Sequence, residues 1–360
     1  MSIVLSSGVS LLPLSATKGT GAILKASDDT SLTSLCSVLR DNRSELLALW
    51  RTCGAILVRG YQVKTAEDFE KAASTLCHLL DRYPGNAPRN KVTQYVWTST
   101  ELPHYLPIPA HAELSYVPKA RPAAILFFCE QPSTSFGQTP IVRLTDVWKS
   151  LPLWLQDKLE RKGGFISVRR ADAKGVRVFD FRSRGKPTKT WRAIFETDDP
   201  AEVEKQCHQD GVAVEWKNGQ KGGDALLKTP FSATRMVDGT KAFSGWFANF
   251  IPAGAVIDSL FVAMHTRRAR DVLTSVLLAV KCVIQMVVHA MWPSQRLSHS
   301  TYADGSEIPL WDIFCIVRAH WKHYVVLSWE KGDVLFVDND VCGHARLPFD
   351  PPRRILTAIA

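Results

Sequence analysis

Cysteine pairs are absent from this 360-residue sequence, which has eight scattered cysteines and no Cys-x-x-Cys spacing. That excludes the usual zinc fingers, iron–sulfur ligand runs and thioredoxin-type sites, and eight cysteines are too few for a disulfide scaffold. We therefore expect reduced thiols in a cytoplasmic protein. Internal repeats and low-complexity tracts are also lacking. With 46% hydrophobic and 22% charged residues, the composition excludes disordered, collagen-like and coiled-coil chains.

Basic residues are missing from the first 17 positions, so the amino terminus does not resemble a secretory signal. One apolar segment, Val272 to Trp292, is long enough for a membrane span, but Lys281, Gln285 and His289 interrupt it. Their spacing of four aligns them along one side of a helix. We expect an amphipathic helix that packs on the domain, with no transmembrane span, and docking on a membrane or a partner stays open.

Acidic residues are outnumbered, because 44 Lys and Arg face 35 Asp and Glu, a formal charge of +9. Nine basic residues lie between Arg169 and Arg192, opposed only by Asp172 and Asp180. Such a segment could attract a carboxylate substrate, an acidic carrier protein or nucleic acid, or could simply be a solvated loop.

Apolar periodicity predicts helices and strands along the whole chain. Helices are expected at 31–50, 65–80, 145–163, 200–210 and 310–323, and strands at 54–58, 123–129, 212–216, 325–329, 334–337 and 355–359. The run at 123–129 is continuously apolar and should be buried on both faces. Strands at both ends with helices between them predict one closed β-sandwich or barrel spanning residues 1–360. We treat an apolar segment at about 253–300 as a helical insertion.

Two histidines are followed two residues later by a carboxylate. His208 and Asp210 end a predicted helix, where a solvated surface pair is the simpler interpretation. His111 and Glu113 lie in an extended segment, where side chains two apart point to one face and can chelate one metal. A third ligand from elsewhere would complete the 2-His-1-carboxylate site of non-haem Fe(II) oxygenases.

The carboxyl-terminal segment offers candidates for that third ligand, in the sequence VLFVDNDVCGHARLPFDPPRRILTAIA. His344 follows a predicted strand and a tight turn, and Arg354 opens the final strand. An arginine fork suits the distal carboxylate of a keto acid bound to the metal.

These motifs together resemble the TauD/TfdA-type Fe(II)/2-oxoglutarate dioxygenases, and within them the clavaminate-synthase-like and SyrP-like branch, which uses His-x-Glu. The segments FFCEQPSTSFGQTPIV, SWEKGDVLFVDN and GHARLPF carry the resemblance. It implies a mainly β fold, a jelly-roll double-stranded β-helix with flanking helices. It also implies that the cofactor is Fe(II) and that 2-oxoglutarate and O2 are cosubstrates.

Carried over to this chain, the resemblance implies that His111, Glu113 and His344 hold the iron. Thr139 would hydrogen-bond 2-oxoglutarate and Arg354 would pair with its distal carboxylate. Arg353 could take that role if the strand register differs by one residue, because neighbouring strand residues face opposite sides.

The implied activity is hydroxylation, or desaturation or cyclisation, of an aliphatic C–H bond, with succinate and CO2 released. The substrate would be a small molecule, either free and anionic or bound to a carrier, and the enzyme could be a homo-oligomer. Candidate pocket aromatics are Trp97, Tyr116 and Trp246. Two alternatives stay open: a basic protein that binds or demodifies nucleic acid, although nucleic acid is a less favoured partner, and a non-catalytic relative that acts through its apolar helix.

Overall fold

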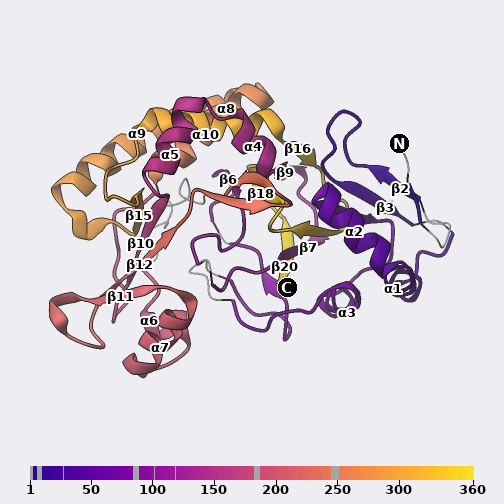
Figure 1. The fold of residues 1–360 in the computed structure, drawn as a ribbon, viewed down its shortest axis with the longest axis horizontal. Helices are drawn as coiled ribbons and strands as arrows, with labels where there is room; N and C mark the ends of the chain where they lie inside the picture. Colours follow the sequence, from indigo (N-terminus) through magenta and orange to yellow (C-terminus); the bar gives the residue numbers. More distant parts are fainter. Residues whose placement is uncertain are drawn as a thin grey trace.

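Two β-sheets face each other at the centre of the molecule and are flanked by helices (Figure 1). The computed structural model describes residues 3–5, 10–26, 28–83, 89–100, 102–117, 119–181, 187–244 and 251–360. The major sheet has the order β1-β2-β3-β4-β17-β7-β20-β5. Its strands are β1 Ile3–Val4, β2 Ser10–Pro13, β3 Ala22–Lys25, β4 Ala55–Arg59, β5 Trp97–Thr98, β7 Ala124–Gln131, β17 Val334–Asp338 and β20 Arg354–Ile359.

The minor sheet has the order β16-β9-β18-β6 and is antiparallel throughout. Its strands are β6 Ile108–His111, β9 Thr139–Arg143, β16 Val325–Leu327 and β18 Cys342–Arg346. Opposed to β4, β17, β7 and β20, these four strands complete the jelly-roll that the resemblance implied. The predicted mainly β fold with helical insertions is therefore confirmed.

Strand β7 shows why the two sheets stay together. Leu126 and Phe128 on one face pack with the helices beside the major sheet, whereas Ile125 and Phe127 on the other face fill the space between the sheets. All four are buried, as the continuous apolar run predicted.

Helices α1 Leu32–Asp41, α2 Arg43–Cys53 and α3 Ala66–Leu76 cover the outer face of the major sheet. The single helix expected at 31–50 is two helices, because the chain leaves helical geometry at Asn42, whose backbone and side-chain N–H groups both donate to the Val38 carbonyl. At α3 the predicted start is confirmed, since Thr65 and Asp68 form a reciprocal capping box.

A third sheet, of order β11-β12-β10-β15, extends from the jelly-roll. Its strands are β10 Phe165–Ala171, β11 Ala213–Trp216, β12 Ala225–Phe231 and β15 Ser298–Tyr302. Four further helices are α4 Leu144–Ser150, α5 Leu153–Arg161, α6 Trp191–Phe195 and α7 Pro200–Asp210. Two short antiparallel pairs complete the strands: β8 Ser135–Phe136 with β19 Phe349–Asp350, and β13 Thr234–Val237 with β14 Thr240–Phe243.

The apolar segment at about 253–300 forms two helices, α8 Pro252–Thr266 and α9 Ala269–Met291, which pack against each other. Together with α10 Leu310–His323 they cover one side of the molecule (Figure 1). Gln285 and His289 lie on the buried side of α9, but Lys281 is exposed, so the three polar residues do not share one environment as the spacing predicted. That 1–360 forms a single domain with an insertion there stays a prediction.

Candidate metal centre

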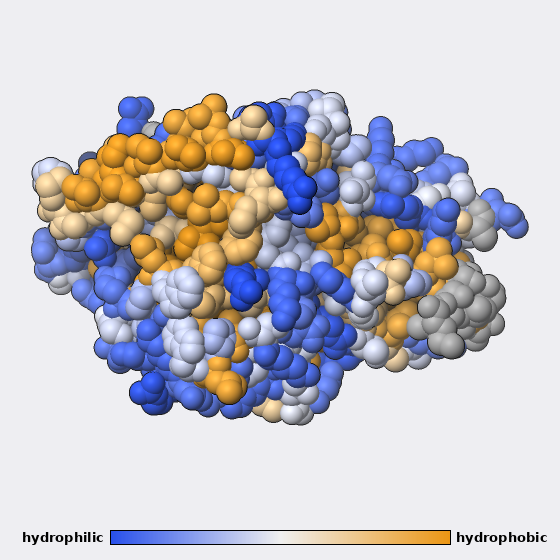
Figure 2. All heavy atoms as spheres, turned by 90° about the horizontal axis from the view of Figure 1, so that it is seen from above, coloured by the Kyte–Doolittle hydropathy of each residue, from blue (hydrophilic) through white to orange (hydrophobic). Residues whose placement is uncertain are grey.

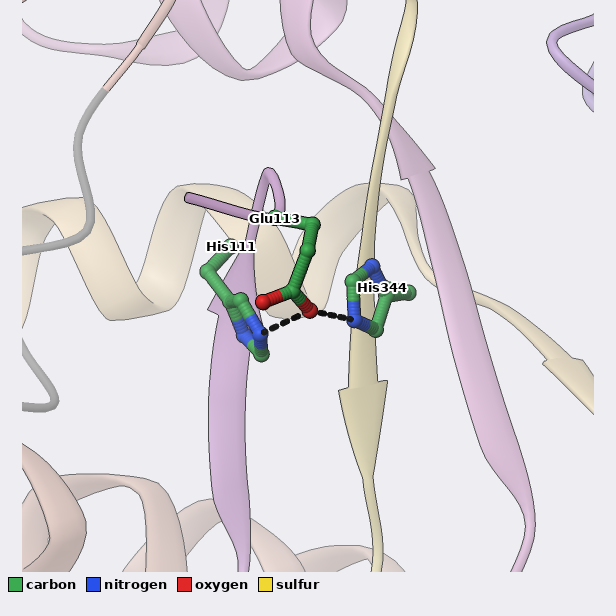
Figure 3. A group of neighbouring side chains, drawn as sticks. All are labelled: His111, Glu113 and His344. Atoms are coloured by element: carbon green, nitrogen blue, oxygen red, sulfur yellow. Dashed lines mark ion pairs between the residues drawn. The ribbon is translucent and has the colours of Figure 1, made fainter. Parts of the chain in front are cut away.

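Two histidines face each other across neighbouring strands of the minor sheet. His111 ends β6 and His344 is the middle residue of β18, and the antiparallel register pairs these two residues directly. Directly opposed side chains lie about 5 Å apart at Cβ, so the pairing itself brings the rings together. Their ring centroids are 4.4 Å apart, and both side chains are buried (Figure 3).

Glu113 reaches the same point from just beyond the end of β6. The strand ends at His111, and Glu113 lies in the following turn rather than in the extended segment that the sequence predicted. Leu114 adopts a left-handed conformation (φ 53°) within that turn. The Glu113 Oε2 atom lies 3.9 Å from His111 Nε2 and 3.6 Å from His344 Nε2 (Figure 3).

The backbone of Glu113 is held by a side chain from far along the chain. Asn339 Oδ1 accepts from the Glu113 N–H at 2.6 Å, and Asn339 Nδ2 donates to the carbonyls of Glu113 and Pro122 at 2.9 Å each. Asp338 shapes the turn before β18, since its Oδ1 accepts from the N–H groups of Asp340 and Val341. Both residues belong to the tight turn that the sequence predicted before His344, and Asn339 also joins this turn to Glu113.

The surroundings of His111 and Glu113 keep the imidazole neutral and the carboxyl ionised, so both side chains can donate an electron pair to a metal. His111 Nδ1 donates to the Pro109 carbonyl at 2.8 Å, which leaves Nε2 unprotonated in the neutral ring. Burial, reinforced by His344, lowers the pKa of His111 to about 3, so this ring is neutral at physiological pH. Burial opposes ionisation of Glu113, but Arg89 and both histidines hold the pKa of that carboxyl below its usual range.

Tyr83 and Arg89 bind the Glu113 carboxylate from its other side. The Tyr83 hydroxyl donates to Oε1 at 2.6 Å, and Arg89 Nη2 donates to Oε2 at 3.2 Å. The Arg89 guanidinium also lies over the Tyr83 ring, 4.4 Å from its centroid. Sequence reasoning missed both residues, because no motif marks a tyrosine and an arginine that reach the site from an irregular segment.

The three donors fit a metal ion. One ligand atom from each of His111, Glu113 and His344 lies within 4.8 Å of the other two, and all three residues are buried. A neutral imidazole and an ionised carboxylate whose lone pairs face one another are stabilised by a cation between them, and His–carboxylate sets of this kind suit non-haem Fe(II).

Thr139 begins β9 and lines a cavity of about 250 Å³ beside both histidines. Its buried hydroxyl oxygen accepts from Trp329 Nε1 at 2.9 Å. Because the hydroxyl already accepts from the indole, its own proton can be donated to a group in the cavity. The position agrees with the expected role of Thr139, and Trp329 is a further contact that the sequence did not indicate.

The two arginines before the final strand face opposite ways, and the first choice, Arg354, faces outward. Its side chain is 52% exposed and its Nε binds Glu130 Oε2 at 2.6 Å. Arg353, the alternative, lines the cavity, and its Nε donates to the Gly137 carbonyl at 3.1 Å. The β20–β7 pairing shifts register between Arg354 and Ile355, which a sequence pattern does not reveal.

Positive charge dominates the described cavity wall. Five arginines line it, and its described lining includes no Asp or Glu; they are Arg89, Arg169, Arg170, Arg346 and Arg353. Burial lowers the pKa of Arg353 to about 10. Two members of the basic segment predicted at 169–192, Arg169 and Arg170, are therefore among the lining residues, although the Arg170 guanidinium is paired with Asp172. Of the candidate aromatics, Tyr116 lines it, Trp97 is buried between the sheets, and Trp246 lies outside the described residues.

The competing His-x-carboxylate pair does not approach a third ligand in the described part of the chain. Asp210 is buried at the end of α7 and binds Arg82 Nη2 at 3.0 Å, so its carboxylate is paired rather than solvated as predicted. His208 is exposed.

The chain was compared with known families, curated proteins and solved structures. The family described as taurine catabolism dioxygenase TauD, TfdA family matches residues 13–214, more than half of the chain. A clavaminate synthase-like protein of Arabidopsis thaliana is 27% identical over 339 residues, covering 91% of this chain and 88% of that protein. The dapdiamide synthesis protein DdaC of Enterobacter agglomerans is 27% identical over 307 residues, covering 85% and 82%. The crystal structure of PvcB from Pseudomonas aeruginosa is 13% identical with a TM-score of 0.45, covering 99% and 89%.

Proposed function

The chain belongs to the TauD/TfdA family of dioxygenases, and from that membership we propose that its buried His111–Glu113–His344 cluster binds the catalytic iron. It is an Fe(II)- and 2-oxoglutarate-dependent oxygenase, and its cofactor and cosubstrates are Fe(II), 2-oxoglutarate and O2. The observation that carries the ligand assignment is the direct cross-strand pairing of the two histidines with Glu113 between them.

When bound, the iron and 2-oxoglutarate supply the oxidising chemistry, in which the cosubstrate is converted to succinate and CO2 while a C–H bond of the substrate is oxidised. The protein's part is to hold these groups and the substrate in a fixed arrangement and to keep water out. In our proposal Arg353 binds the distal carboxylate of 2-oxoglutarate, and the Thr139 hydroxyl donates a hydrogen bond to the cosubstrate.

The proposed substrate is a small molecule with an anionic group, which is oxidised at an aliphatic carbon. The two negative charges of 2-oxoglutarate and that of Glu113 balance the charges of Fe(II) and Arg353, so Arg89 brings a further positive charge to the site. Its side chain is only 7% exposed, and its Nε and Nη1 atoms have no hydrogen-bond partner among the described residues. Arg89 already pairs with Glu113 through Nη2, and its two remaining N–H groups favour a further anionic ligand, because burying donors without partners is costly.

Iron binding is tested by adding Fe(II) and 2-oxoglutarate to the protein without oxygen. We expect a weak visible metal-to-ligand charge-transfer band, and expect the His344→Ala variant to lack it while keeping the far-ultraviolet circular dichroism of the native chain. A native chain that stays folded and gives no band contradicts the assignment of these three ligands.

The substrate class is tested with a library of small carboxylic, phosphoric and sulfonic acids and their neutral amides or esters, with succinate release as the readout. We expect turnover of anionic members only, and a KM raised about tenfold to a hundredfold in Arg89→Gln, the loss of one charge-assisted contact. Preference for the neutral members would contradict an anionic substrate. Whether that substrate is free or carried on a protein is tested by offering the same acyl group in both forms.

The two rival interpretations gain less support from the structure. Arg169 is buried and Arg170 binds Asp172 Oδ1 at 2.7 Å, so these two residues do not form an outward basic patch for nucleic acid. A non-catalytic role is opposed by the converging donor set, and succinate production with any substrate would exclude it. A cytoplasmic location and a homo-oligomer stay predictions.

A further inference from the structure

Helix α9 turns its apolar side outward. Ten large apolar side chains of α9, which we call the outer face of α9, are each between 46 and 62% exposed: Val272, Leu273, Val276, Leu277, Val280, Val283, Ile284, Met286, Val287 and Met291. Figure 2 shows a continuous hydrophobic band on this side of the molecule. Helix α9 has 23 residues and is therefore about 35 Å long. An apolar surface that continues along this length differs from the single scattered apolar side chains that are normal on a soluble protein.

The side of α9 that faces the protein is unusually polar. Ser275 Oγ donates to the Ser259 carbonyl of α8 at 2.8 Å, Gln285 Oε1 accepts from the Phe181 N–H at 3.0 Å, and His289 Nε2 lies 3.0 Å from the Phe179 carbonyl. These contacts fix the rotation of the helix about its axis. The outward position of the apolar side chains is therefore part of the fold, because rotating the helix would bury them only by breaking these bonds.

The exposed charges within helices α8 and α9 and the turn between them have one sign. Between Pro252 and Met291 the only acidic residues are Asp258 and Asp271, and both are buried. The exposed charged residues of this stretch are Arg267, Arg270 and Lys281, all of them basic. Arg270 pairs with Asp350 Oδ1 at 2.6 Å, so Arg267 and Lys281 are the two that carry the argument. Trp292, which directly follows α9, is exposed, and so is Trp311 of α10, which stacks on Phe314 of the same helix. Apolar side chains bordered by basic residues and tryptophan are typical of surfaces that lie at a lipid headgroup layer.

From these observations we propose that the outer face of α9 docks the protein on a bilayer surface that contains anionic lipids. Lys281 is the thirteenth of the 23 residues of α9. A symmetric antiparallel contact between two copies of α9 along its full length would centre near Lys281 and place it close to Lys281 of the other copy, with no exposed carboxylate on either helix to offset the repulsion. A spanning orientation would strip Ser275, Gln285 and His289 of their partners, whereas a helix lying in the headgroup layer keeps them.

The cavity wall includes residues on both sides of α9 in the chain. Its lining includes Ala255 of α8 and the Leu297–Ser298 segment that follows α9. Docking through α9 would therefore hold the cavity wall near the headgroup layer. The proposal does not depend on the iron site, since the binding of lipid is measured without metal or cosubstrate.

The test is flotation of the full chain with vesicles of phosphatidylcholine, with and without phosphatidylserine. We expect recovery with the phosphatidylserine vesicles, weakened by salt, and at least about tenfold weaker binding by the Val276→Glu/Val283→Glu double variant. Met236→Glu is the matched control, because Met236 is similarly exposed on β13, away from α9. Lys281→Glu should weaken binding to the anionic vesicles and leave binding to pure phosphatidylcholine unchanged.

Three results would overturn the proposal: no recovery with either vesicle at low salt, equal recovery of the double variant and the native chain, or a dimer without lipid that the double variant converts to a monomer. The last result would identify a second copy as the group that covers α9. All variants are first compared by circular dichroism and thermal unfolding, which these outward substitutions should leave unchanged.

Discussion

Replacing Arg353 and Arg354 one at a time by glutamine separates a cosubstrate contact from a surface ion pair. The guanidinium of Arg353 lines the cavity, and its Nη atoms have no hydrogen bond to any described residue. Arg354 is half exposed and paired with Glu130. Only the first substitution should change the affinity for 2-oxoglutarate.

The expected magnitude follows from these surroundings. A charge-assisted hydrogen bond contributes about 1.5–3 kcal/mol, and loss of a forked contact from a buried guanidinium to a carboxylate should cost about 3–4 kcal/mol. That weakens 2-oxoglutarate binding by roughly 100-fold to 1,000-fold. A solvent-exposed ion pair contributes about 0–1 kcal/mol to stability, so Arg354→Gln should weaken binding less than about fivefold.

The assay is an anaerobic titration of the Fe(II) protein with 2-oxoglutarate, followed by the visible absorption band. Thermal unfolding with and without cosubstrate is an independent readout, because a ligand that binds only the folded state raises the transition temperature. Arg353→Gln should lose most of that rise. Its stability without cosubstrate should be equal to or higher than that of the native chain, since a buried charge without a described carboxylate partner is removed.

Two results would refute this reasoning. One is an Arg354→Gln variant that loses affinity as strongly as Arg353→Gln. The other is an Arg353→Gln variant that binds 2-oxoglutarate normally, which would mean that the buried guanidinium binds the substrate or stabilises the fold instead.

Three further outcomes are expected. Thr139→Val keeps the side-chain shape but removes the hydroxyl, so the anaerobic titration should show about 5-fold to 20-fold weaker 2-oxoglutarate binding; unchanged affinity would exclude that contact. Asn339→Ala removes two hydrogen bonds to the Glu113 backbone and one to the Pro122 carbonyl, and urea unfolding should show a loss of about 2–4 kcal/mol together with weaker Fe(II) binding. Burial raises the pKa of Asp258 to about 7, so the folded state retains a proton that the unfolded state releases near pH 4. Stability is then lost as the pH rises from about 4 to 7, by at most about 4 kcal/mol, and Asp258→Asn should be more stable than the native chain at pH 8 but not at pH 4; a pH-independent difference would contradict this.

The sequence was sufficient to predict those features whose structure depends on residues close together in the chain. The helix starts predicted near 65 and 200 and the helix end predicted at 210 occur as expected, because the capping hydrogen bonds of Thr65, Asp199 and Gly211 are made within one turn. The buried strand β7 was predictable because a continuous apolar run is stable only between two layers. The spacing of His111 and Glu113 indicated the metal chemistry, since two donors two residues apart can reach one ion.

Long-range pairing decided the rest. The sequence alone could not choose between Arg353 and Arg354, because a register shift in the β20–β7 ladder determines which of them faces the cavity. Tyr83 and Arg89 reach Glu113 from a segment without regular pattern, and Asn339 binds it from 226 residues away. The outward rotation of α9 is set by polar partners on other elements, so its apolar periodicity showed that one face is hydrophobic but not that this face points to solvent. The spacing of residues in the sequence indicates which side chains share a face of a helix or strand. Only the packing of distant segments decides whether that face contacts the core, a cavity or solvent.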